Sequence, residues 1–205
     1  MADSATRVDP RITRSRRAVL DAALAELAER GYGAFTIDGV ATRAGVARST
    51  IYRLWPDRAA LVADAIESLN QQPPPRPVDD ETSRDRIVAL VNHLSRAMRN
   101  SPVAACLPAL IDGAERDPVL RRLHHGYNDR RRHALVVAVA AAVEDGEARS
   151  DIDPDLAATA LAGAVIYRRL MTGRPLRSGE VVPLVDTVLG PVPESPRPSD
   201  RPLSS

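Results

Sequence analysis

Residues 36–53 read TIDGVATRAGVARSTIYR, and this stretch decides the fold. Thr36 can cap a short helix that runs to about Ala44, and Gly45 then breaks the chain. A second short helix follows from about Ala47 to Trp55. Two short helices joined by a tight turn that holds a glycine have the layout of a helix-turn-helix. The stretch therefore predicts a small helical unit of a kind that binds nucleic acid.

The second of these helices has an apolar face and a polar face. At about 100° per residue, Ile51 and Leu54 fall within about 40° of Ala47 and form the inner face. The outer face carries Arg48, Ser49, Tyr52 and Arg53, with Thr50 on its border. An arginine can bond a guanine edge or a phosphate, and Tyr and Ser hydroxyls can bond phosphate. The face fits DNA recognition, and a solvated face of a small amphipathic helix is the alternative reading.

Helical patterns extend on both sides of this stretch. Residues 14–30 place apolar side chains on one stripe, and Gly31 ends it. Downstream, Pro56 stops the second short helix and Asp57 can cap another, which runs to about Leu69. Arg58 begins that helix, where it can reach a phosphate.

Positive charge is concentrated at the start of the chain, although the formal net charge is only +1. Residues 1–58 hold ten arginines against seven acidic residues, whereas the remainder holds 18 against 20. Arg14, Arg16 and Arg17 follow Arg11 with no acidic residue among them. A DNA-binding head, in which Arg16 and Arg17 contact the DNA backbone of any sequence, would show this imbalance. On charge alone, a solvated helix face is the favoured alternative.

Several classes of function are excluded or disfavoured by composition. All 28 basic residues are arginine, so no phosphate-loop or Schiff-base lysine exists. Cys106 is the single cysteine, which rules out an intrachain disulfide and a Cys-rich zinc site. Paired with a histidine it would be the one nucleophile to consider, but no base or orienting acid lies near it in sequence. We therefore expect no enzyme and no cofactor.

The histidines and the apolar segments narrow the picture further. His124, His125 and His133 invite a metal interpretation, but no carboxylate spacing completes a site, so no metal is expected. The apolar stretches are far shorter than the ~20 residues of a membrane span. The polar, arginine-rich N-terminus has no apolar signal segment. A cytoplasmic protein without membrane contact is the expectation.

The rest of the chain predicts an all-α fold in two domains. The proline-rich residues 71–77 form a stiff boundary. We expect a DNA-binding domain over 11–70, a C-terminal domain over 78–190 and a disordered tail over 191–205. Helices are expected at about 80–99, 103–115, 118–145, 154–172 and 178–189. Pro102, Pro118 and Pro154 sit at first-turn positions.

From Arg14 to about Leu69 the chain resembles the DNA-binding domain of the tetracycline-repressor (TetR) family of bacterial regulators. The resemblance rests on these motifs: Gly31-Tyr32, Phe35-Thr36, Val40-Ala41, Ala44-Gly45-Val46, Ser49-Thr50-Ile51-Tyr52, Trp55-Pro56-Asp57-Arg58 and Ala60-Leu61-Val62. It implies an all-helical homodimer whose third helix enters the major groove of a palindromic operator. Arg48, Ser49, Thr50, Tyr52 and Arg53 would then lie on the DNA, with Thr36 and Arg58 at phosphates. Two positions depart from the family. Gly39 lies inside a helix, where glycine costs about 1 kcal/mol against alanine. Leu54 stands at a position where family members often have a polar residue.

The resemblance also implies that the C-terminal domain binds a small effector that releases the DNA. An effector pocket there would be mainly aliphatic, because that part holds only two aromatic residues. Its polar anchors would come from His93, Asn92, Cys106, His124, Tyr127, Asn128 or Tyr167. Satisfied polar groups in a core are the alternative for His93 and Tyr167. For Arg168 and Arg169, pairing with nearby carboxylates is favoured over an anionic effector.

Two apolar stripes near the C-terminus predict the dimer interface. The first is a small-residue stripe at helical spacing, made of Ala157, Ala160, Leu161, Ala164 and Val165; the second is Val181, Leu184, Val185 and Val188. If both stripes face one core within the protomer, a monomer suffices. In the family, however, such helices form a twofold interface, and a twofold protein suits a palindromic site. The expected function is that of a DNA-binding repressor released by a small molecule. A helical ligand-binding regulator that activates, or that binds DNA only weakly, is the alternative.

Overall fold

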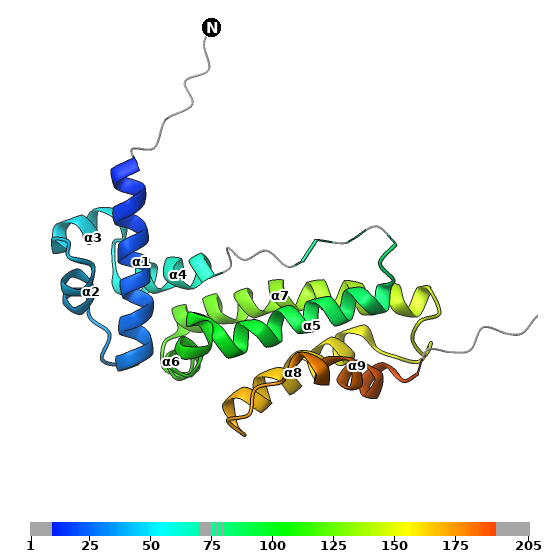
Figure 1. Cartoon of the computed structure of the whole chain (residues 1–205). Coiled ribbons are helices and arrows are strands. Elements are labelled where there is room, and N and C mark those ends of the chain that lie inside the picture. Colours follow the sequence, from blue (N-terminus) through cyan, green and yellow to red (C-terminus); the bar gives the residue numbers. More distant parts are fainter. Residues whose placement is uncertain (1–9, 70–74, 77, 79, 192–205) are drawn as a thin grey trace, which may run out of the picture. The chain divides into compact units, whose positions relative to one another are not determined.

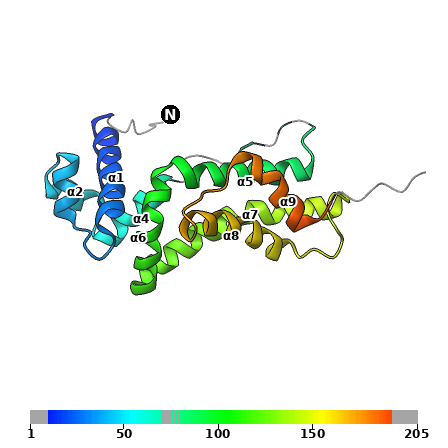
Figure 2. The ribbon, with the colours of Figure 1, turned by 60° about the horizontal axis from the view of Figure 1, so that its bottom comes forward.

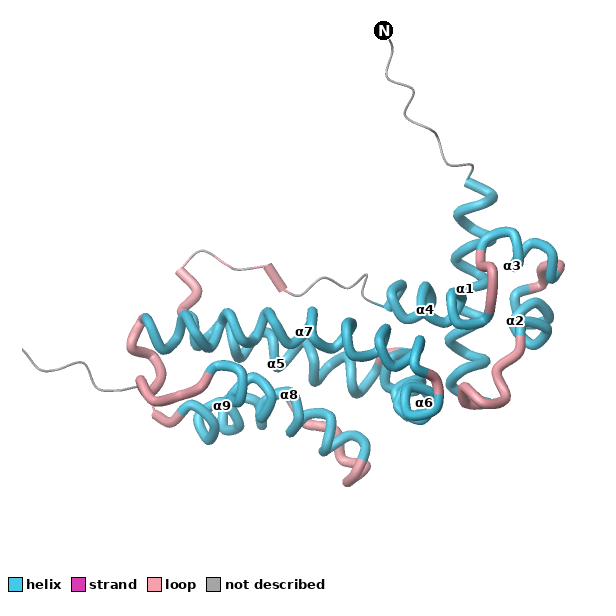
Figure 3. The backbone as a smooth tube through the Cα atoms, turned by 180° about the vertical axis from the view of Figure 1, so that it is seen from behind, coloured by secondary structure: helices cyan, strands magenta, loops and turns pink. Residues whose placement is uncertain are grey.

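The computed structural model describes residues 10–69, 75–76, 78 and 80–191, and every regular element in these ranges is helical (Figures 1 and 3). The predicted all-α class is confirmed. Most of the proline-rich boundary and, apart from Pro191, the expected tail lie outside the described residues. None of the described helices is long and apolar enough to cross a membrane.

The elements follow one another closely along the chain. Their order is α1 (Pro10–Arg30), α2 (Ile37–Ala44), α3 (Arg48–Leu54), α4 (Arg58–Leu69), α5 (Ser83–Asn100), α6 (Pro102–Arg116), α7 (Pro118–Glu144), α8 (Pro154–Leu170), the 3₁₀ turn η1 (Ser178–Glu180) and α9 (Val181–Leu189). Three helices begin at the prolines that the sequence places in first turns. Asp153 caps α8 by accepting the backbone N–H groups of Asp155 and Leu156.

The described residues divide into two compact units. The first joins α1–α4 to α6 and the start of α7, up to residue 129. Here α1 packs against α2, α4 and α6. Cys106, Leu110, Leu120 and Tyr127 belong to the same buried cluster as Leu20, Leu27 and Ile51. The compact unit that holds α1–α4 thus also includes α6, whereas the sequence predicts an N-terminal domain that ends at residue 70.

The second unit consists of α5, the rest of α7, α8, η1 and α9 (Figure 2). Its core is aliphatic, with Ile87, Val139, Leu161 and Val185 fully buried. Arg84 ties the unit together, because its guanidinium donates to the carbonyls of Glu147 and Gly190 at 2.9 and 2.6 Å. It also pairs with Asp186 of α9 at 2.7 Å.

Candidate nucleic-acid interface

The turn between α2 and α3 has the geometry of a helix-turn-helix. The Thr36 hydroxyl accepts the Gly39 N–H at 3.0 Å and caps α2, as predicted. Gly45 ends α2 in the left-handed region, with φ of +66°, and Val46 N–H donates back to the Ala41 carbonyl at 3.1 Å. A side chain other than glycine is strained in this conformation, so Gly45 sets the angle between the two helices.

The short helix α3 separates a buried side from an exposed side. Ile51 is fully buried, and Leu54 is half-buried against the same core. Arg48, Ser49, Tyr52 and Arg53 are exposed, and Thr50 is half-buried. Ala47 differs from the expectation: it precedes the helix as its N-cap and is exposed. An exposed face of two arginines, a tyrosine and a serine is thus presented by α3.

The two arginines of this face differ in their surroundings. The Arg48 Nε lies 2.5 Å from Asp38 Oδ1 of α2, so its terminal nitrogens remain open to a base or a phosphate. Arg53 forms no ion pair or hydrogen bond with any residue in the described part of the chain. An arginine without an internal partner has its full donor set available.

Two arginines near the start of α1, Arg16 and Arg17, are already paired. Arg16 Nη2 donates to both carboxylate oxygens of Asp64 in α4, at 2.8 and 2.6 Å. The same carboxylate accepts the Trp55 Nε1–H at 2.8 Å. Arg17 pairs with Asp21 one turn along α1. Sequence reasoning misses the network of Arg16, Asp64 and Trp55, since nothing in the sequence links positions 48 residues apart.

The two residues expected at phosphates lie at helix starts. The Thr36 oxygen is used as a cap acceptor, yet its own hydroxyl hydrogen remains free to donate. Arg58 is exposed at the first residue of α4, and its guanidinium carbon lies 4.5 Å from the centre of the Tyr32 ring.

The candidate effector residues are divided between the two units. Cys106, His124 and Tyr127 belong to the unit that contains the head, and His93 and Tyr167 belong to the other. Cys106 is buried and donates its S–H to the Leu24 carbonyl, while Tyr127 is buried in the same core. Burial raises the pKa of the Cys106 thiol to about 11, which suits a packing role and not a nucleophile.

The two candidate histidines, His93 and His124, are partly buried. Burial lowers the pKa of His93, and the charges of Arg131 and Arg96 lower it further. Burial also lowers the pKa of His124, whose ring nitrogen Nε2 lies 3.0 Å from Asn128 Nδ2. In the part of the chain that the structure describes, the buried Asn92 Oδ1 lacks a hydrogen-bond partner. Within the same residues, no group of three or more histidine, cysteine or acidic side chains could hold a metal ion.

Tyr167 lies on the surface, with an exposed fraction of 61%, because it projects from the outer side of α8. Neither expected role, pocket lining or core, fits that position. The side chains of Ala157, Leu161 and Val165 take the inner side of α8 and are buried within the protomer. On α9 the same holds for Val181 and Val185.

The expected interface stripe is thus largely buried within the protomer, whereas the outer side of α8 carries a different set. The exposed residues there are Leu156, Thr159, Ala160, Gly163 and Tyr167. Of the other expected interface residues, Ala164, Leu184 and Val188 are half-buried. Both sides of α8 are apolar or small, so periodicity alone does not distinguish them.

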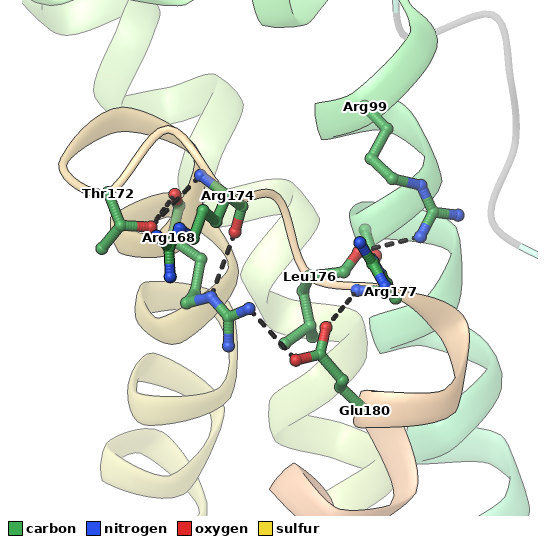
Figure 4. Close-up of polar contacts among 8 residues, drawn as sticks. Arg99, Arg168, Thr172, Arg174, Leu176, Arg177 and Glu180 are labelled. Atoms are coloured by element: carbon green, nitrogen blue, oxygen red, sulfur yellow. Dashed lines mark hydrogen bonds and ion pairs between the residues drawn. The ribbon is translucent and has the colours of Figure 1, made fainter.

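The loop between α8 and η1 is held by polar contacts (Figure 4). Arg168 donates to Glu180 Oε1 and to the Arg174 carbonyl, both at 3.1 Å. Arg168 therefore pairs with a carboxylate, as the sequence favours. The buried Ser95 hydroxyl and Arg99 both donate to the Leu176 carbonyl, at 2.6 and 2.8 Å. These contacts fasten the loop to α5.

Comparisons with known proteins agree with this geometry. The family model described as "Bacterial regulatory proteins, tetR family" matches residues 19–65. The model "Tetracyclin repressor-like, C-terminal domain" matches residues 77–188. These two models leave few of the described helical residues unmatched.

Relatives and solved structures point the same way. The chain is 30% identical over 180 residues to YdeS, an uncharacterized HTH-type transcriptional regulator of Bacillus subtilis, covering 86% of this chain and 88% of the relative. It is 32% identical over 173 residues to a DNA-binding transcriptional repressor TetR of Mycobacteroides abscessus, covering 84% and 90%. A TetR-family regulator structure from Rhodococcus sp. matches with a TM-score of 0.73 at 22% identity, over 85% of this chain and 98% of that one.

Proposed function

The chain belongs to the tetracycline-repressor (TetR) family of helix-turn-helix transcriptional regulators, and we propose that the exposed face of α3 reads its operator. The observation that carries this proposal is the separation of the helix into a fully buried Ile51 and an exposed set containing Arg48, Tyr52 and Arg53. We favour a repressor, because the Mycobacteroides abscessus relative is named a DNA-binding transcriptional repressor, and we propose a cytoplasmic location because its target is DNA.

Within this face, Arg53 contacts a base edge of the operator, and Asp38 orients the side chain of Arg48 through an ion pair. Arg53 enters the complex without breaking an internal contact in the described part of the chain. The pair between Arg48 and Asp38 is exposed and therefore weak, so DNA can compete for the guanidinium. Arg17 contacts the DNA backbone, because its own surface pair with Asp21 is similarly weak and DNA can compete for the guanidinium.

The protein acts as a homodimer on a palindromic site, with reading helices ~34–36 Å apart for adjacent major grooves. Its contact surface is the exposed stripe of α8 formed by Leu156, Ala160, Gly163 and Tyr167, together with Val182 of α9. Small residues at the centre of the stripe let two helices approach, and exposed apolar side chains grouped on one face favour burial by a partner. A second copy satisfies both conditions because a twofold contact uses the same patch twice.

A modest-sized, mainly apolar effector binds the C-terminal domain and releases the DNA. The aliphatic core of this unit suits such a ligand, since bundle ligands bind between helices. Asn92 and His93 of α5 are the polar groups that would orient it, because the buried Asn92 Oδ1 lacks a hydrogen-bond partner in the described residues.

Gel mobility shift tests the proposal with DNA from upstream of the protein's own gene. We expect a retarded band that survives excess unrelated duplex. A band that unrelated duplex abolishes at equal concentration would overturn operator recognition.

The effector proposal has a separate test. If a ligand weakens DNA binding by a certain factor, operator DNA must weaken binding of that ligand by the same factor.

A further inference from the structure

Tyr32, in the turn between α1 and α2, is fixed on two sides by the segment where α6 ends and α7 begins. Its side chain is buried, and its hydroxyl donates to Asp117 Oδ2 at 2.7 Å. Its ring lies against Gly113 of α6, where a β-carbon would come within 2.8 Å of Tyr32 Cγ and 2.5 Å of Leu120 Cδ2. The absence of a side chain at Gly113 therefore makes room for the ring.

Asp117 is itself held in place. Its Oδ1 accepts the backbone N–H groups of Val119 and Leu120, at 2.8 and 3.3 Å, and so caps α7. The Tyr32 hydroxyl, followed by these two N–H groups, lowers the pKa of Asp117. Burial and the bond to Asp117 raise the pKa of Tyr32, so the phenol stays a neutral donor. The pair is thus a fixed, charge-assisted hydrogen bond at neutral pH.

Arg58 stacks on the ring that this bond fixes. Its guanidinium carbon lies 4.5 Å from the Tyr32 ring centre, which is within the range of a cation–π contact. The ring covers one face of the guanidinium, and Arg58 also donates a hydrogen bond to the Tyr32 side chain. A guanidinium has five N–H donors, so others are left for a further acceptor because Arg58 is exposed. Only Trp55, Pro56 and Asp57 separate Arg58 from the end of α3.

We propose that Tyr32 and Asp117 are positioning residues for a DNA phosphate contact made by Arg58. The proposal rests on the proposed function and adds a dependence on α6 and α7: the ring that orients Arg58 is anchored to Gly113 and Asp117, which lie outside the helix-turn-helix. A displacement of the end of α6 or the first turn of α7 moves the Tyr32 ring and withdraws the guanidinium from its phosphate. Through Arg58, helices beyond the reading head therefore alter DNA affinity.

The test measures the dissociation constant as a function of NaCl concentration, using a fluorescent duplex from upstream of the gene. Arg58→Gln removes the positive charge and should lower the steepness of log K against log salt by about 0.9 for each phosphate that is no longer neutralised. Tyr32→Phe keeps the ring but removes the bond to Asp117. We expect it to weaken binding several-fold and to shift the salt slope toward that of Arg58→Gln, with Asp117→Asn behaving alike.

A double variant separates positioning from mere stability. In the Arg58→Gln background, Tyr32→Phe should cause no further decrease in affinity, because the guanidinium that Tyr32 positions is gone. Ser68→Ala removes a different hydrogen bond of α4, from the Ser68 hydroxyl to the Ala65 carbonyl, and should leave the slope unchanged. Wild-type slope and affinity in Tyr32→Phe, equal decreases in both backgrounds, or a slope change in Ser68→Ala would each overturn the inference. Failure of the wild type to bind the duplex would instead overturn the proposed function, and the inference with it.

Discussion

The carboxylate of Glu26 lies where the β-carbon of residue 39 would project, and Gly39 is the residue that permits this. A β-carbon built on Gly39 comes within 2.6 Å of Glu26 Cδ. Glu26 is 2% exposed, with Arg30 and Arg43 at 3.2 and 3.7 Å from its oxygens. The glycine that departs from the family pattern thus has a structural reason: it lets a buried, paired carboxylate lie between α1 and α2.

Gly39→Ala should therefore destabilise the protein although alanine favours helices by about 1 kcal/mol. Displacing the Glu26 carboxylate from its arginine partners should cost about 1–3 kcal/mol. The net effect is then a decrease in stability of up to about 2 kcal/mol. Urea unfolding measures the difference. In a Glu26→Ala background the same substitution should become neutral or stabilising, because the obstacle is gone. A more stable Gly39→Ala single variant would contradict this account of the site.

Arg16→Ala and Arg17→Ala should differ in what they change. Arg16 holds both oxygens of Asp64, which also accepts the Trp55 indole N–H. Its removal should lower thermal stability along with DNA affinity. Arg17 forms an exposed pair with Asp21, so its removal should cost less than about 0.5 kcal/mol of stability. Arg17→Ala should weaken binding to specific and unrelated duplexes alike. Equal melting temperatures for the two variants would show that Arg16 does not stabilise the fold more than Arg17 does.

Ala160→Arg should produce folded monomers. Ala160 is exposed on the outer side of α8, so a long charged side chain fits the protomer but not a second copy. Sedimentation velocity together with circular dichroism measures assembly and folding. Ser150→Arg, in the exposed loop before α8, is the matched control and should remain dimeric. A dimeric Ala160→Arg protein would place the interface elsewhere.

Acid should loosen the loop before α9. The backbone N–H of Arg177 and the guanidinium of Arg168 lower the pKa of Glu180. A depressed carboxyl pKa contributes stability that is present above the ordinary range of glutamate and is lost as pH falls through the lower, folded-state value. The melting temperature of the wild type should thus exceed that of Glu180→Gln at neutral pH, and the gap should close on acidification. A gap independent of pH would show that the charge of Glu180 contributes nothing.

Local signals in the sequence predict most of the fold and the outer face of α3. Prolines at 102, 118 and 154, the cap residues Thr36 and Asp57, and Gly45 each act within a few residues, so they can be interpreted without the structure. Contacts between distant segments could not be predicted. The bonds from Tyr32 to Asp117 and from Arg16 to Asp64 join positions 85 and 48 residues apart. The sequence also could not show which side of α8 packs into the core, because the residues on both sides are apolar or small.

Fluorescence anisotropy of Arg53→Ala on the operator duplex is the most direct test of the central claim that α3 reads the operator. Removal of a bidentate base contact should weaken operator binding by about 1–3 kcal/mol and leave binding to unrelated duplex much less affected. Arg122→Ala, which removes an exposed arginine of α7, should bind both duplexes as the wild type does. Operator affinity that is unchanged in Arg53→Ala would contradict the assignment of this face to DNA.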